Sequence, residues 1–226
     1  MGRRSWLLIG TAVLAAAVFA LMWVGYVRHW GWLVELDDRG LAGPYRYGSA
    51  HPAWVTAWDV FCAVFGPVTF RFAGAVVIVI ALVRKHFRIA LVVLLTVELS
   101  GVVTQLTKRL VDRPRPATAL VYTPSSSFPS GHALGVMVSV AALLVVVWPL
   151  VRHGLRGWLV VAGAVLVVAI GVGRVVLNVH HPSDVAAGWA LGYAYFAVCL
   201  LAAPPYPERR GEPLRDEKPV APGSAR

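Results

Sequence analysis

Long apolar stretches separated by short polar segments dominate the pattern of this chain. Five of them are nearly free of charge and approach the roughly 20 residues that a helix needs to cross a bilayer. They cover residues 5–27, 89–107 (with Glu98 inside), 133–151, 157–173 and 185–203. A sixth stretch, 59–84, contains Arg71 and a Gly66-Pro67 step that favours a kink. The pattern predicts an all-α integral membrane bundle of about six transmembrane helices.

The composition agrees with this fold class. Hydrophobic residues make up 58% of the chain, charged residues 14%, and the mean hydropathy is +0.68. These values are too apolar for a soluble domain. Arg3 and Arg4 precede a first apolar stretch longer than a usual signal-peptide core, so we expect an uncleaved anchor. Cys62 and Cys199 fall inside predicted spans and are interpreted as small core residues rather than as a disulfide.

The distribution of Lys and Arg predicts the orientation. With both termini inside, the inward segments carry a modest excess of cations, which becomes clear only when Lys108, Arg115 and Arg174 are set aside as substrate ligands. The longest loops and the acidic segment 35–38 then lie outside. We therefore expect a multi-pass plasma-membrane protein with cytoplasmic termini and an outer-face, extracytoplasmic active site.

The net charge of +10 raises the possibility of a nucleic-acid partner. The cations are spread over loops and tail instead of forming one stripe, so membrane lipids are the expected partners and nucleic acid is not. From residue 204 onward, prolines alternate with charges of both signs. This composition predicts a membrane domain over residues 1–203 followed by a disordered cytoplasmic tail over 204–226.

Three polar stretches stand at the ends of the predicted spans. They read K-x6-R-P, P-S-G-H and G-R-x5-H-x3-D. Their members are Lys108, Arg115 and Pro116; Pro129, Ser130, Gly131 and His132; and Gly173, Arg174, His180 and Asp184. A phosphoryl group in transfer spreads negative charge over three oxygens, and positioned cations and N–H donors stabilise that charge. These residue types at one membrane level therefore point to binding and cleavage of a phosphate ester.

A proline-rich loop connects the first two stretches. Residues 109–130 contain four prolines and cannot be helical throughout. Ser130 is placed as the N-cap of the fourth span, and Gly131 lets an oxyanion approach the free N–H groups of the helix start. For Ser130 and Gly131 taken alone, a capped helix start without a ligand is the alternative. His132 directly after them favours the ligand site.

The third stretch covers the break between the fifth and sixth spans. The His181-Pro182 step disfavours continuation of the fifth span, and Ser183 is predicted to cap the sixth. Asp184 in its first turn would then face His180. A carboxylate bonded to one imidazole nitrogen fixes the tautomer and leaves the other nitrogen free as a nucleophile.

A metal site is the competing interpretation of the histidines. It would use His132, His180, His181 and Asp184. We disfavour it because a second carboxylate is absent and the three nearby cations would repel a divalent ion.

Structural roles are expected for other polar residues. Arg109 and Arg113 are predicted to snorkel into the headgroup layer. Arg71 and Glu98 come out at similar depths in neighbouring spans, so an intramembrane ion pair or a shared polar partner is expected. The tryptophan-rich segment 28–58 is either an interfacial lid or an aromatic belt that anchors helix ends.

In order and spacing, the three stretches resemble the tripartite signature of the type 2 phosphatidic acid phosphatase family. That family also includes bacterial undecaprenyl-diphosphate phosphatases and is related to the vanadium haloperoxidases. The resemblance runs over residues 108–184, about a third of the chain, and the six-span layout extends it further. One departure is Gly173, where the family often has a serine whose hydroxyl contacts phosphate.

The resemblance implies metal-independent hydrolysis of a lipid phosphate, without a cofactor. It assigns His180 as the nucleophile that forms a phosphohistidine, Asp184 as its orienter, and His132 as acid and base. It assigns phosphate binding to Lys108, Arg115, Ser130, Gly131 and Arg174. The substrate would be a prenyl diphosphate, phosphatidic acid or phosphatidylglycerol phosphate. A lipid phosphotransferase with the same site and, from another class, a phosphate or organic-anion transporter are the alternatives, and the oligomeric state is open.

Overall fold

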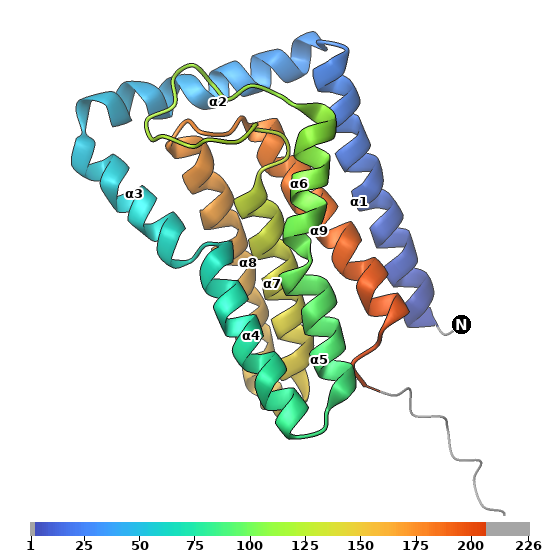
Figure 1. Cartoon of the computed structure of the whole chain (residues 1–226). Helices are drawn as coiled ribbons and strands as arrows, with labels where there is room; N and C mark the ends of the chain where they lie inside the picture. Colours follow the sequence, from blue (N-terminus) through green and yellow to red (C-terminus); the bar gives the residue numbers. More distant parts are fainter. Residues whose placement is uncertain (1–2, 207–226) are drawn as a thin grey trace, which may run out of the picture.

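The computed structural model describes residues 3–206, and the greater part of the predicted tail, residues 207–226, lies outside them. The described chain is helical, with no β-strand (Figure 1). Its helices are α1 (Arg3–Val27), α2 (Gly31–Ala50), α3 (Pro52–Val64), α4 (Pro67–Val83), α5 (Phe87–Val93), α6 (Ser100–Val111), α7 (Gly131–Val147), α8 (His153–Val176) and α9 (Pro182–Ala202). Six helical stretches are long and apolar enough to cross a membrane, which confirms the predicted all-α membrane bundle.

Two of these spans are each built from two helices. The span Pro52–Val83 consists of α3 and α4, which break at Gly66 where Pro67 begins the next helix, as the Gly66-Pro67 step predicts. The span Phe87–Val111 consists of α5 and α6 on either side of a π-helical turn, Leu94–Glu98. Turns of this kind are frequent at functional positions in helices, and here the turn ends at an intramembrane carboxylate.

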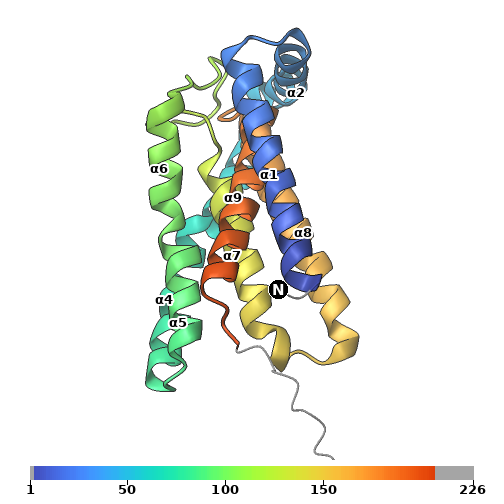
Figure 2. The ribbon, with the colours of Figure 1, turned by 90° about the vertical axis from the view of Figure 1, so that its right-hand side faces the viewer.

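Helix α2 lies across one end of the bundle rather than along it (Figures 1 and 2). Leu33, Asp37 and Leu41 are buried on it at four-residue spacing, so one stripe of α2 faces the bundle. The loop of residues 112–130 emerges at the same end, under α2 in Figure 1. Helix α2 therefore covers this end of the molecule, which is where the site residues gather, and α3 continues from it along the side of the bundle.

Helix α7 packs against α4, α6, α8 and α9. Its close approach to α9 depends on two glycines. A Cβ atom at Gly188 would lie 2.7 Å from the Ser130 carbonyl oxygen, and one at Gly192 would lie 2.8 Å from the Leu134 carbonyl oxygen. These two positions hold the first half of α9 against the start of α7, which matters because both helices carry site residues at their starts.

Replacing Gly192 by alanine is expected to lower the unfolding temperature of the purified protein. The new methyl group meets backbone atoms of Leu134 that cannot rotate away, and overpacking of this kind costs about 1–3 kcal/mol. Gly10→Ala in α1 is the control, because a Cβ there meets nothing within 4 Å. Equal unfolding temperatures for the two variants in the same detergent would contradict the packing described.

Candidate active site

The three polar stretches meet at the end of the bundle that α2 crosses (Figure 1). Lys108 lies in the last turn of α6, and Arg115 lies in the loop that follows it. His132 lies in the first turn of α7, Arg174 in the last turn of α8, and His180 just before α9. Two loops and the helix ends beside them thus bring the site residues together.

Loop carbonyls hold the two cations of the first stretch. Lys108 is 5% exposed, and its Nζ donates to the carbonyl oxygen of Ser126. The guanidinium of Arg115 donates from Nε to the Ser125 carbonyl and from Nη1 to the Val179 carbonyl, both at 2.6 Å. Burial, together with the charge of Arg174, lowers the pKa of Arg115 to about 10, so it stays protonated at neutral pH.

His180 faces these cations and is only 2% exposed. Its Nε2 lies 3.2 Å from Nη1 of Arg115. A guanidinium only donates, so Nε2 is an acceptor and the hydrogen of a neutral ring sits on Nδ1. Burial lowers the pKa of His180 to about 3, and Arg115 and Arg174 act in the same direction against the opposing Asp184 carboxylate. The ring is therefore neutral near pH 7, with a lone pair directed at the cations.

Asp184 is fully buried, but it does not hydrogen-bond His180. The Nδ1 atom of His180 lies 3.7 Å from Oδ2 of Asp184, too far for a hydrogen bond. That oxygen instead accepts from the N–H and the Nδ1 of His181, at 2.9 and 3.1 Å. The direct bond expected between His180 and Asp184 is thus replaced by a capping box at the start of α9.

The cap of α9 also corrects the expectation for Ser183. His181 is the N-cap and Pro182 is the first helical residue, so Ser183 falls inside the helix. The proline explains the shift, because it is well suited to the first helical position and favours an extended residue before it.

Ser130 caps α7 as predicted, with its Oγ accepting from the Ala133 N–H at 3.5 Å. It is fully buried, and its own N–H donates to the Asp184 carbonyl at 2.9 Å, which joins the starts of α7 and α9. The N–H of Gly131 donates to no other residue among 3–206. A helix start with a free N–H and no Cβ at this position is suited to receive an oxyanion.

Arg174 is 4% exposed, and its Nε has no hydrogen-bond partner among the described residues. A buried cation with an unpaired donor is costly, and an anionic ligand would remove that cost. Gly173 beside it is set by packing: a Cβ there would lie 2.7 Å from Cys62 Sγ and 2.9 Å from the Trp58 ring. The close approach of α3 to α8 therefore leaves no room for the serine that the family often has.

His132 is half-buried beside the break between α3 and α4, where its ring atoms come within 3.2 Å of the Cβ position of Gly66. The positive charges of Arg174, Arg115 and Lys108 all act on this ring. No group of three His, Cys, Asp or Glu side chains in residues 3–206 has the arrangement of a metal site.

Arg113, predicted to snorkel, is buried instead, which makes that prediction wrong. Its Nη1 donates to Oδ1 of Asp184 at 2.7 Å and to Oγ of Ser183 at 2.8 Å. Its Nη2 donates to Oδ2 of Asp37 at 2.8 Å, and its guanidinium lies 4.6 Å from the ring centre of Tyr26. The carboxylates of Asp37 and Asp184 thus compensate this charge inside the protein.

Asp37 is the second residue of the site region that the sequence patterns missed. Its Oδ1 accepts from the Ser183 N–H at 2.9 Å and its Oδ2 from the Ser183 hydroxyl at 2.6 Å. The four-residue spacing of Leu33, Asp37 and Leu41 was the signal in the sequence that could have predicted a buried Asp37, because it places all three on one stripe of α2. A carboxylate on the apolar stripe of a helix needs a buried partner.

A lateral pocket opens between α4 and α6 next to the site. It encloses about 520 Å³ and is lined by Arg71, Glu98, Gln105, Arg109 and Gly131, among others. No ion pair joins Arg71 and Glu98 among the described contacts, and Arg71 Nε and Glu98 Oε1 are buried without a hydrogen-bond partner. The predicted ion pair is thus absent, although both side chains border the same pocket. Gly131 connects this pocket to the helix start at the site.

A family model described as the PAP2 superfamily matches residues 89–206, more than half of the chain. Phosphatidylglycerophosphatase B of Bacillus subtilis (strain 168) is 34% identical over 110 residues, 47% of this chain and 54% of the relative. Decaprenylphosphoryl-5-phosphoribose phosphatase of Mycobacterium tuberculosis is 43% identical over 98 residues, 41% of this chain and 49% of the relative. Lipid A 1-phosphatase of Rhizobium etli is 35% identical over 108 residues, 43% of each chain. The chain thus spans about half the length of the curated relatives it matches.

The fold has a solved counterpart. The crystal structure of a transmembrane PAP2 type phosphatidylglycerolphosphate phosphatase from Bacillus subtilis superposes with a TM-score of 0.73 at 21% sequence identity. The match covers 88% of this chain and 99% of that chain. At this identity the likeness concerns the fold.

Replacing Asp37 by alanine is expected to destabilise the protein strongly, because Arg113 would keep its buried charge and lose one of two carboxylates. Breaking a buried ion pair in this way costs about 3–5 kcal/mol. The control is Glu35→Ala on the same helix, which removes an exposed ion pair with Arg39 and should cost less than about 1 kcal/mol. Chemical denaturation of both variants tests this, and a loss at Asp37 no larger than at Glu35 would contradict the buried pairing.

Proposed function

Since the chain belongs to the PAP2 superfamily, we propose that it hydrolyses the phosphate or diphosphate group of a membrane lipid. The observation that carries the proposal is the contact of a neutral His180, through Nε2, with Arg115 at 3.2 Å, at the end of the bundle where Lys108 and Arg174 also lie. The relatives are named as phosphatases of phosphatidylglycerophosphate, of decaprenylphosphoryl-5-phosphoribose and of lipid A. A phosphate on a lipid is the group common to those names. Prenyl diphosphates, phosphatidic acid and phosphatidylglycerol phosphate are the substrates to test.

The reaction proceeds in two steps. Nε2 of His180 attacks phosphorus, the bond to the leaving oxygen breaks, and His132, which must enter this step as an imidazolium, gives its proton to that oxygen and becomes neutral. His132 then accepts a proton from water, the water oxygen attacks the phosphohistidine, and inorganic phosphate leaves with His180 regenerated. Each step passes through a transition state whose charge lies on the equatorial phosphoryl oxygens.

The cations stabilise that charge by exchanging partners. Lys108 and Arg115 donate to carbonyl oxygens of Ser125, Ser126 and Val179. Phosphate oxygens are stronger acceptors than neutral carbonyls, so a bound phosphate replaces these contacts. Arg174 gains a partner for its Nε, and the N–H of Gly131 completes the set of donors. The move of Arg115 toward phosphate also frees Nε2 of His180 for attack.

The lateral pocket supports a membrane substrate. It opens between α4 and α6 and reaches Gly131, so the phosphate can enter the site while the lipid tail stays in the bilayer. The cations gather at one end of the spans, whereas a transporter would place them near the midplane. In the cell, the site would face the extracytoplasmic side of the plasma membrane, with both termini in the cytoplasm.

The His180→Ala variant is expected to lose phosphate release completely, because no other described side chain occupies the position of the nucleophile. His51→Ala is the matched control, since His51 is an exposed histidine at the end of α2 and contacts none of the site residues. Both variants are assayed as purified protein on the panel of lipid phosphates named above. Turnover by His180→Ala close to that of the wild type would rule out the proposed nucleophile.

Metal removal and vanadate test how charge is stabilised. Excess EDTA should leave phosphate release unchanged, since Lys108, Arg115 and Arg174 supply the positive charge that a metal ion would otherwise supply. Vanadate should inhibit by occupying the phosphate position. Activity that EDTA abolishes and a divalent ion restores would contradict the proposal.

A further inference from the structure

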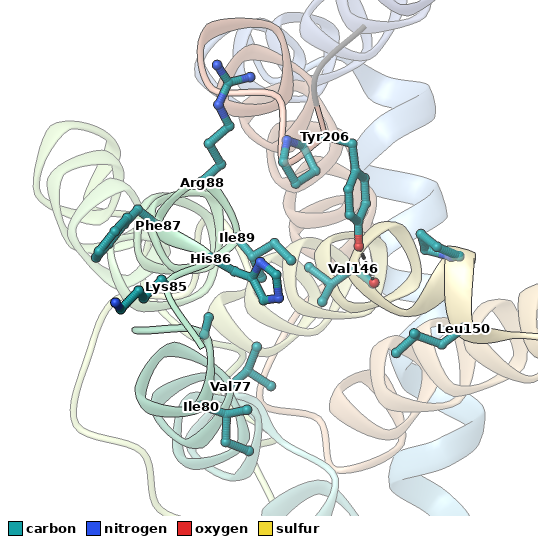
Figure 3. Close-up of a pocket in the computed structure, with 13 residues that line it drawn as sticks. Val77, Ile80, Lys85, His86, Phe87, Arg88, Ile89, Val146, Leu150 and Tyr206 are labelled. Carbon is teal, nitrogen blue, oxygen red and sulfur yellow. Dashed lines mark hydrogen bonds between the residues drawn. The ribbon is translucent and has the colours of Figure 1, made fainter. Parts of the chain in front are cut away.

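An apolar cavity (Figure 3) lies near the turn between α4 and α5, at the end of the bundle away from α2 and the site (Figure 1). It encloses about 750 Å³, within the range of about 300–1,000 Å³ typical of ligand pockets. Its walls come from the end of α4, the start of α5, the end of α7 and the segment after α9. Val77, Ile80, Ile89, Val146 and Leu150 form much of the lining. An apolar lining of this kind is suited to a hydrocarbon chain rather than to water.

One hydrogen bond fixes the last of these walls. The hydroxyl of Tyr206 donates to the Val146 carbonyl oxygen at 2.7 Å, near the end of α7 (Figure 3). This contact holds the segment that follows α9 against α7. The segment after α9 therefore completes the lining that α4, α5 and α7 provide.

Basic side chains line the cavity at the turn between α4 and α5. Lys85, His86 and Arg88 belong to its lining, and the lining contains no carboxylate. Lys85 and Arg88 are exposed, and neither makes an ion pair or side-chain hydrogen bond with a residue of 3–206. In Figure 3 the long side chains of Lys85 and Arg88 extend away from the apolar lining residues. The cavity thus combines an apolar interior with an unpaired positive rim.

The position along the span matches a headgroup layer. Arg88 and Lys108 belong to the same span, and their separation of 20 positions corresponds to about 30 Å at about 1.5 Å per residue. This distance equals the thickness of the hydrocarbon core of a bilayer, about 30 Å. If Lys108 stands at one headgroup layer, the positive rim stands at the other.

We propose that this cavity binds an anionic glycerophospholipid, such as phosphatidylglycerol, from the leaflet opposite the active site. An acyl chain fills the space between α4, α5 and α7, and the headgroup phosphate pairs with Lys85 and Arg88. Charge complementarity favours this occupant over a second copy of the chain, because the rim offers cations only and the lining offers no acceptor for a partner's cations. The inference does not depend on the proposed reaction.

Native mass spectrometry of the detergent-solubilised full chain measures the binding directly. Phosphatidylglycerol and phosphatidylcholine with the same acyl chains are titrated against the protein, and we expect one lipid site with a clear preference for phosphatidylglycerol. Each cation near a membrane surface contributes about 1 kcal/mol to anionic-lipid binding, so the double variant Lys85→Gln/Arg88→Gln should bind phosphatidylglycerol about 25-fold more weakly.

Two further variants keep the outcome decisive. Arg84→Gln/Arg152→Gln removes two exposed cations from the same end of the bundle that do not line the cavity, and it should retain the high-affinity site. Ile80→Trp fills the cavity from an exposed position and should weaken both lipids. The proposal is overturned if Lys85→Gln/Arg88→Gln binds like the wild type, if the control pair loses as much affinity, or if the face forms a lipid-free dimer that Ile80→Trp dissociates.

Discussion

The guanidinium of Arg113 lies buried between the carboxylates of Asp37 and Asp184, at 2.8 and 2.7 Å. A charge in this position is tolerated only while both partners stay in place, since an unpaired buried ion is strongly destabilising. The pairing joins three parts of the chain: helix α2, the loop after α6 and the start of α9. Along the chain, Arg113 stands between Lys108 at the end of α6 and Arg115 in the following loop, so the same pairing restricts where these two cations can lie.

The electrostatics of the site follow from this constraint. Both oxygens of Asp184 are occupied, one by Arg113 and one by His181, so this carboxylate has little capacity left to balance Lys108, Arg115 and Arg174. The excess positive charge is suited to an anion with several oxygens. Burial, assisted by the charges of Arg115 and Arg174, lowers the pKa of His180 and keeps its ring neutral, which leaves the Nε2 lone pair available for bonding to phosphorus.

Sequence patterns predicted the features of the fold that depend on residues close together in the chain. The six spans, the break at Gly66-Pro67 and the cap at Ser130 each depend on neighbouring residues and appear as expected. The contacts of Arg113 escaped prediction because Asp37 is 76 residues away in the chain, and no spacing rule reaches that far. The ion pair expected between Arg71 and Glu98 does not form, and the arithmetic behind that expectation assumed a regular helix where the chain has the π-helical turn Leu94–Glu98.

The most direct test is to look for the covalent intermediate. The protein is mixed with a lipid phosphate, quenched under alkaline conditions that preserve phosphohistidine, digested, and examined by peptide mass spectrometry. The mechanism predicts an acid-labile phosphate on the peptide that carries His180, and on His180 rather than on the adjacent His181. Phosphate found on a different residue, or rapid turnover with no phosphorylated peptide at any quench time, would contradict it.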